Sequence, residues 1–178
     1  MWIFGYGSLM WDNWEQSRGC LKKKTASLRG YERVFNKASM KYWGSASNPG
    51  PTLNVVQKKR ASCRGIAFEF PEQRRQEIVK YLADREKNFD FPELPIKFCL
   101  SSGVKAVVPV YRGKDVLDKT MEELADMALI ASGSSGQCVD YVLNLEEKLR
   151  CLGIHDRVVT SFANLISEKR EAQHRVGP

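Results

Sequence analysis

The stretch FGYGSLM, residues 4–10, lies within ten residues of the start of the chain and decides how the rest is interpreted. It continues an apolar segment that is typical of a buried strand. Gly5 and Gly7 bracket Tyr6, and glycines at this spacing let a backbone turn tightly and point successive N–H groups at one place. We therefore predict that residues 6–9 form a backbone cradle for a carboxylate or an oxyanion, although an ordinary glycine turn after a strand fits the same residues.

Length and composition are those of a globular protein with its own hydrophobic core. The chain has 178 residues, of which 43% are hydrophobic, so residues 1–178 are predicted to form a single domain. No apolar run approaches the roughly 20 residues of a membrane-spanning helix, and the N-terminus lacks the basic and apolar regions of a secretion signal. We expect a cytoplasmic protein without a membrane partner.

Cysteine and histidine usage narrows the chemistry. The five cysteines are scattered, odd in number and never spaced as Cys-x-x-Cys, so they are expected to be reduced thiols, with Cys138 and Cys151 in the core. There are two histidines and no Gly-x-Ser-x-Gly motif, so neither a His-rich metal site nor a Ser-His-Asp arrangement is indicated. The chemistry is expected to use carboxylates and backbone groups, with no cofactor and no metal.

The net charge of +7 raises the hypothesis of nucleic-acid binding. The basic runs at residues 22–24 and 58–60 are short, lie beside predicted turns and have no aromatic residues between them. Solvated loops explain them better, and an anionic small substrate is equally compatible with the charge. No nucleic-acid partner is expected.

Hydrophobic patterns predict a β-rich chain that becomes helical in its last third. Strands are predicted over six ranges, the last of which contains Pro109 and therefore indicates an edge or a bulge: residues 2–6, 28–35, 53–57, 64–70, 95–100 and 104–111. One helix should run from Pro71 to about Asn88. Two more should flank a turn at residues 133–136, and a final helix should begin after Asp156, a good N-cap residue.

Glu86 is the candidate acid/base. Ile78, Leu82 and Glu86 follow one another at spacings of four, so within a helix they share a face. A carboxylate that continues an apolar face is carried away from water and becomes able to accept and return a proton near neutral pH. Alternatively, the helix ends near Arg85, and Glu86 is solvated or paired with a local Lys or Arg.

Several segments together resemble the ChaC-like branch of the γ-glutamylcyclotransferase family. Their order and approximate spacing hold from residue 2 to about residue 166. The matching segments are residues 4–9, Gly30-Tyr31 with Arg33 and Phe35, Arg64-Gly65, Tyr81-Leu82 with Arg85-Glu86, residues 108–111, residues 133–136, Asp140-Tyr141, Leu149-Arg150 and residues 152–156.

The resemblance implies an α+β fold, in which a small mixed β-barrel has helices packed outside. It also implies that a γ-glutamyl amide cyclises to 5-oxoproline and releases an amine. In ChaC-like enzymes the substrate is glutathione, and the second product is Cys-Gly. Carried over by position, the cradle residues Tyr6, Gly7, Ser8 and Leu9 would bind the glutamyl group, Glu86 would be the catalytic acid/base, and Tyr111 would be a further substrate contact.

The chain departs from the family pattern in three places: residues 87–91, Cys138, and residues 42–45. These departures concern the leaving half of the substrate more than the cyclisation. Two alternatives therefore accompany the glutathione hypothesis. One is a cyclotransferase for another γ-glutamyl amino acid or γ-glutamylamine, and the other is a non-catalytic module that binds a small ligand or nucleic acid on the same scaffold.

Overall fold

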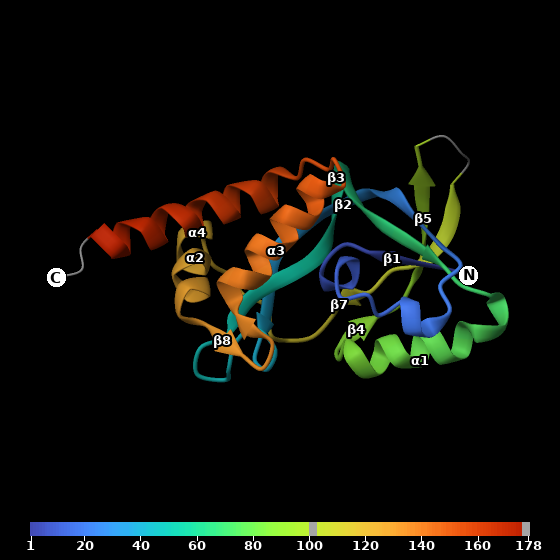
Figure 1. Cartoon of the computed structure of the whole chain (residues 1–178), viewed down its shortest axis with the longest axis horizontal. Coiled ribbons are helices and arrows are strands. Elements are labelled where there is room, and N and C mark those ends of the chain that lie inside the picture. The colour runs from blue at the N-terminus through green and yellow to red at the C-terminus, as the bar shows by residue number, and fades with distance from the viewer. Residues whose placement is uncertain (100–102, 176–178) are drawn as a thin grey trace. The chain divides into compact units, whose positions relative to one another are not determined.

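The structure, a computed structural model, describes residues 1–99 and 103–175 (Figure 1). The chain forms two compact units. Unit 1 comprises Met1–Arg33 and Val55–Lys114, and unit 2 comprises Val34–Asn54 and Asp115–Pro178. Two long strands, β2 (Lys22–Ser39) and β3 (Gly50–Glu69), each begin in one unit and end in the other.

The main sheet is a closed barrel with the strand order β1-β3-β2-β5-β6. Besides the long strands β2 and β3, it contains three short ones: β1 (Trp2–Gly5), β5 (Glu93–Phe98) and β6 (Val104–Val107). Neighbouring strands pair antiparallel where β1 meets β3 and β5 meets β6, and the barrel closes through a parallel bridge between Ile3 and Val107. Alternate residues point inward, as Ala26 and Leu28 of β2 show by their complete or nearly complete burial.

Unit 1 also contains one α-helix and a small second sheet. Helix α1 (Arg75–Arg85) follows a 3-10 turn, η3 (Glu72–Arg74), and buries Ile78 and Leu82 on one face. Strands β4 (Phe89–Asp90) and β7 (Val110–Tyr111) pair antiparallel. Two further 3-10 turns, η1 (Ser8–Met10) and η2 (Gln16–Arg18), connect β1 to β2.

Unit 2 contains three helices that pack against one another: α2 (Met121–Ile130), α3 (Cys138–Cys151) and α4 (Arg157–Arg175) (Figure 1). Thr120 caps α2 with a reciprocal capping box, and Asp156 Oδ1 accepts the N–H groups of Val158 and Val159 at the start of α4. A short hairpin of β8 (Ser132–Gly133) and β9 (Gly136–Gln137) connects α2 to α3.

The predicted α+β barrel with helices is confirmed: the described residues form a closed five-stranded barrel and four α-helices. The turn at residues 133–136 and the N-cap at Asp156 are also confirmed. The break at Pro109 separates β6 from β7, which belong to different sheets. None of the described helices is long and apolar enough to cross a membrane.

Other element predictions were wrong in their bounds. The two strands predicted on either side of residues 58–60 are one strand, β3, so this basic run lies in a strand and not in a turn. The lysines at residues 22–24 likewise begin β2, because backbone pairing within a barrel overrides the low strand propensity of lysine. The strand predicted at residues 95–100 corresponds to β5, which begins two residues earlier and runs from Glu93 to Phe98. Leu100 lies outside the described residues.

Candidate active site

The backbone cradle forms where β1 ends and the chain turns into η1. Met10 N donates to Gly7 O at 2.9 Å, and Trp11 N donates to Ser8 O at 3.2 Å. Within the described part of the chain, no acceptor receives the N–H groups of Gly7, Ser8 or Leu9. These three donors lie at the start of a 3-10 turn, where backbone N–H groups have no partner in the turn itself. They are available to an anionic group.

Tyr6 is held at both its side chain and its carbonyl. Its hydroxyl donates to Pro109 O at 2.8 Å, and its carbonyl oxygen accepts from Arg33 Nε at 2.9 Å. Arg33 is 1% exposed and also donates to the carbonyl of Arg64. Because C=O and N–H point in opposite directions across a trans peptide, a fixed Tyr6 carbonyl directs the N–H of Gly7 away from Arg33. Arg33 thereby sets the orientation of one cradle donor.

The end of the cradle is attached to helix α1 through Trp14. The indole Nε1 of Trp14 donates to Leu9 O at 3.1 Å. The same ring stacks on Tyr81 of α1, with the ring centroids 5.7 Å apart and the planes 14° from parallel. Leu9 itself is buried. The cradle therefore has a fixed position relative to the helix that precedes Glu86.

Glu86 lies one residue beyond the last residue of α1. Its N–H still donates to Leu82 O at 2.7 Å, but its φ of −105° and ψ of 74° leave the helical region. Its side chain is 19% exposed, and its Oε1 atom accepts from Arg85 Nε at 3.2 Å. The prediction that Glu86 continues the helical face of Ile78 and Leu82 is wrong in this respect. The alternative, a helix end near Arg85 with a local ion pair, describes the structure.

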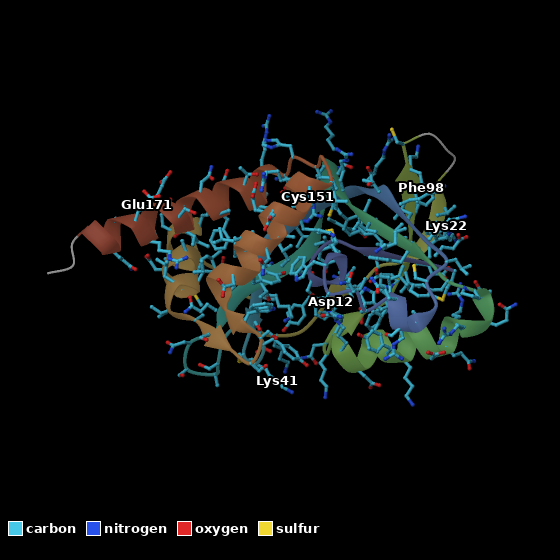
Figure 2. The ribbon with its side chains drawn as sticks, viewed as in Figure 1. Asp12, Lys22, Lys41, Phe98, Cys151 and Glu171 are labelled. Atoms are coloured by element: carbon cyan, nitrogen blue, oxygen red, sulfur yellow. The ribbon has the colours of Figure 1, made fainter. Side chains whose placement is uncertain are left out.

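Arg85 connects Glu86 to the cradle. Its Nη2 donates to Ser8 Oγ at 3.2 Å, and its Nη1 contacts the Asp12 carboxylate and lies 3.5 Å from the Tyr81 hydroxyl. Burial alone would lower the pKa of Arg85, but the hydrogen bond to Tyr81 and the charges of Asp12 and Glu86 raise it above its usual value. Asp12, labelled in Figure 2, lies on the segment that follows η1.

Tyr111 lies in β7, opposite Phe89 of β4. The two rings contact edge to face, with centroids 5.2 Å apart, and Tyr111 is buried. A Cβ placed on Gly113 would be 2.2 Å from the Tyr111 hydroxyl oxygen, so the chain passes very close to this group. Residues 87–91, which differ from the family pattern, contain β4. Asn88, directly before β4, has a left-handed φ of 65°.

All the predicted site residues lie in unit 1, and contacts between side chains and backbone connect their surroundings. Ser8 and Glu86 share Arg85, Tyr6 contacts Pro109, and Tyr111 packs on Phe89, three residues after Glu86. Residues 6–9, Glu86 and Tyr111 come from β1 and η1, the end of α1, and β7. The arrangement offers backbone donors for an anion and a carboxylate for proton transfer.

The sequence interpretation missed four supporting residues: Asp12, Trp14, Arg33 and Arg85. Arg85 had a local signal, because it stands directly before Glu86 and the alternative interpretation named a local Arg. Asp12 had none, since 73 positions separate it from its partner Arg85 (85 − 12). Arg33 was quoted only as part of the family pattern, and a single arginine in a strand gives no indication of burial.

The five cysteines differ in burial. No disulfide joins the five, all of which lie in the described part of the chain. Cys138 is buried in unit 2, donates to Pro51 O at 3.4 Å, and burial raises the pKa of its thiol to about 12. The expectation of a core thiol is confirmed for Cys138 and wrong for Cys151, which is exposed. The described residues contain no group of three or more His, Cys, Asp or Glu side chains that could hold a metal ion.

Known proteins resemble the chain along most of its length. Residues 1–169 match the family described as ChaC-like protein. The chain is 31% identical to gamma-glutamylcyclotransferase 2-3 of Arabidopsis thaliana, with 96% of this chain and 92% of the relative covered. It is also 31% identical to the glutathione-specific gamma-glutamylcyclotransferase of Escherichia coli, with 88% of this chain and 68% of the relative covered.

Among solved structures, a gamma-glutamyl cyclotransferase specific to glutathione from yeast superimposes with a TM-score of 0.84. The superposition covers 94% of this chain and 96% of the yeast chain at 18% identity, so it shows that the two share a fold. Taken with the match over residues 1–169, the evidence shows that the chain belongs to the ChaC-like protein family.

Proposed function

We propose that this protein is a γ-glutamylcyclotransferase that converts glutathione to 5-oxoproline and Cys-Gly. One observation carries the proposal: Arg85 contacts both Ser8 of a cradle with three available N–H groups and the candidate base Glu86. The names of the Arabidopsis and Escherichia coli relatives support the same reaction class, and the name of the Escherichia coli relative supports glutathione as the substrate.

The proposed binding mode follows from the available donors. The N–H groups of Gly7, Ser8 and Leu9 bind the carboxylate of the γ-glutamyl group, as turns with convergent N–H groups bind anions. Tyr6 contributes through its fixed backbone, because its side chain is already bonded to Pro109. Tyr111 of β7 is a further contact for the glutamyl chain in this binding mode. This placement folds the glutamyl chain toward a five-membered ring.

The proposed chemistry needs one proton carrier. Glu86 removes a proton from the substrate α-ammonium, whose reference pKa is about 8. The amine then attacks the γ-carbonyl carbon, a C–N bond forms, and the carbonyl oxygen becomes an oxyanion. When the oxyanion collapses, the original amide C–N bond breaks, and Glu86 returns the proton to the departing nitrogen. The ring nitrogen loses its second proton, which passes through solvent to the released amine, so that Cys-Gly leaves as an ammonium. Because the attack is intramolecular, positioning supplies much of the rate acceleration.

The test is incubation of the purified protein with glutathione, followed by chromatography and mass spectrometry for 5-oxoproline and Cys-Gly. We expect both products in equal amounts. The control is a Glu86→Gln preparation, which excludes a contaminating activity. Absence of 5-oxoproline from the wild-type reaction, with the protein shown to be folded, would refute the glutathione proposal.

The second candidate is a cyclotransferase for another γ-glutamyl amino acid or γ-glutamylamine. The left-handed turn at Asn88 favours it, because this turn opens the segment that departs from the family pattern and directly follows Glu86. A panel of γ-glutamyl compounds, compared by kcat/KM for 5-oxoproline formation, distinguishes the two. A preference of more than tenfold for a compound other than glutathione would replace the first candidate.

A nucleic-acid binding module has less support. Lys22, Lys23 and Lys58 each have a carboxylate partner at 2.7–2.8 Å, namely Glu69, Glu15 and Glu32. Half of the six residues in the two basic runs thus have their charge partly neutralised within the chain. We also propose that residues 1–178 act as a single domain in the cytoplasm, since β2 and β3 belong to both units and no cysteine is in a disulfide.

A further inference from the structure

The guanidinium group of Arg85 contacts four side chains. Its Nε faces Glu86 Oε1 at 3.2 Å, its Nη2 donates to Ser8 Oγ, and its Nη1 contacts the carboxylate of Asp12 and the Tyr81 hydroxyl. Two carboxylates thus share one cation, and Glu86 contacts it through a single nitrogen. Glu86 Oε2 has no hydrogen-bond donor among the described residues.

Asp12 is itself held in place by the turn that carries it. Its Oδ1 atom accepts from Trp14 N at 3.5 Å, while Oδ2 faces Arg85. Asn13, which lies between Asp12 and Trp14 in the sequence, has a left-handed φ of 55° and forms a tight turn there. The Asp12 carboxylate therefore presents a fixed oxygen to Arg85.

We propose that Asp12 is a positioning residue for the reaction, because it holds the Arg85 guanidinium so that only Nε faces Glu86 and Glu86 Oε2 stays available for the substrate proton. The inference rests on the proposed function, in which Glu86 moves that proton. Asp12 does not touch the substrate in this account. It acts through Arg85.

The physical basis is that the carboxylates of Asp12 and Glu86 compete for the N–H groups of the Arg85 guanidinium. Guanidinium and carboxylate groups prefer a bidentate arrangement in which two parallel N–H groups meet both oxygens. If the contact with Asp12 is removed, Arg85 can rotate to bind Glu86 through two nitrogens. Both Glu86 oxygens are then occupied, and the charge of the Glu86 carboxylate is more fully neutralised. Glu86 becomes a weaker base, and the hydrogen bond from Nη2 to Ser8 is lost.

The experiment compares Asp12→Asn with Asp84→Asn. Asp84 is the matched control, since it precedes Arg85 on the same helix, is exposed, and its carboxylate makes no hydrogen bond or ion pair with the described residues. With glutathione as substrate, we expect Asp12→Asn to lower kcat about tenfold, a coupling typical of contacting charged residues, with KM changed by less than about threefold. The acid limb of its kcat/KM profile should move to lower pH. Asp84→Asn should match the wild type in all three measurements.

A double-mutant cycle tests the route of the effect. If Asp12 acts through Arg85, Asp12→Asn should have no further effect in an Arg85→Ala background. Additive effects in the cycle would overturn the inference, and so would an Asp12→Asn enzyme with an unchanged pH profile. Failure of the proposed function looks different, because the wild type would then form no 5-oxoproline from any γ-glutamyl compound. In that case the inference is overturned with it.

Discussion

The two compact units differ in the kind of contact that each contains. Around the cradle in unit 1, polar side chains such as Asp12, Arg85 and Glu86 contact one another, and each depends on the position of the next. In unit 2 the helices pack through fully buried apolar side chains such as Leu145 and Phe162. A substitution in the polar group should first change the chemistry. A substitution in the apolar group should first change the free energy of unfolding.

The largest expected effect is on activity and comes from Glu86→Gln. This change keeps the size of the side chain and removes the base, so kcat should fall by roughly 10²- to 10⁴-fold, the usual contribution of a general acid/base. The melting temperature should stay near that of the wild type, because Glu86 is partly exposed. Steady-state kinetics and thermal unfolding measure the two quantities on the same preparation.

The controls for Glu86→Gln are Glu69→Gln and Glu72→Gln. Glu69 pairs with Lys22, and Glu72 pairs with Arg75 and the N-terminal amine, so neither contacts the cradle. Both should keep wild-type turnover. A Glu86→Gln enzyme within about threefold of wild-type kcat would show that another group carries the proton.

The second prediction tests the apolar side of the comparison. Phe162 is fully buried in α4, and its ring lies 4.3 Å from that of Phe35. Phe162→Ala should lower the free energy of unfolding by about 3–5 kcal/mol, because it removes a large apolar side chain and leaves a cavity. Urea unfolding measures the loss. Ile130→Ala, at a side chain that is 67% exposed, should change it by less than about 0.5 kcal/mol.

The contrast between the polar contacts of unit 1 and the apolar contacts of unit 2 would be contradicted if Phe162→Ala strongly lowered the kcat of the folded protein. Kinetics at a temperature where the variant is fully folded, with active enzyme counted by titration, separate the two effects. We expect kcat within about threefold of the wild type.

A smaller effect is expected from Ser8→Ala. The substitution removes the acceptor for Arg85 Nη2 but leaves the N–H groups of the cradle in place. Loss of one hydrogen bond of this kind should reduce kcat/KM by about three- to tenfold. Ser47→Ala, which affects only an exposed contact with Ser45, is the control and should have no effect. A loss as large as that of Glu86→Gln would mean that the Ser8 side chain, and not the backbone, binds the substrate.

The smallest effect is a difference between two thiols at opposite ends of α3. Burial raises the pKa of Cys138 to about 12, whereas Cys151, which is labelled in Figure 2, is exposed. At pH 8, iodoacetamide should therefore alkylate Cys151 and leave Cys138 unmodified, as mass spectrometry of peptides can show. The pKa of a cysteine is about 8.5 in an unfolded chain, and that of Cys138 is about 12 in the folded protein. The buried thiol therefore stabilises the fold fully below about pH 8.5, and this stabilisation is lost as the pH rises toward 12. Cys138→Ala should weaken this alkaline dependence.

Local patterns were sufficient for some parts of the fold. The N-cap at Asp156 and the turn at residues 133–136 depend on neighbours in sequence, and both were predicted. The length of β3 was not, because three consecutive basic residues look like a turn when the pairing strand is unknown. Barrel closure stabilises strands that their own composition does not favour.

The candidate site also combines features that local sequence predicts with features that depend on residues far apart in the sequence. The cradle and Glu86 were predicted from glycine spacing, helical spacing and the family resemblance, and their roles stay predictions. The contact of Arg85 with Asp12 could not be found, since it joins residues that only the fold brings together. The position of Glu86 just beyond α1 also escaped prediction, because helix ends are poorly defined by composition when no glycine or proline marks them.

The burial of Arg33 has a consequence for how substrate binding responds to pH. A guanidinium group does not lose its proton in proteins, so the positive charge beside Tyr6 O is permanent. Peptide N–H groups do not titrate either. The attraction of the cradle for a carboxylate should therefore stay constant as the pH falls from neutrality into the acid range. A loss of activity in acid would then come from the chemical step and not from release of the carboxylate by the cradle.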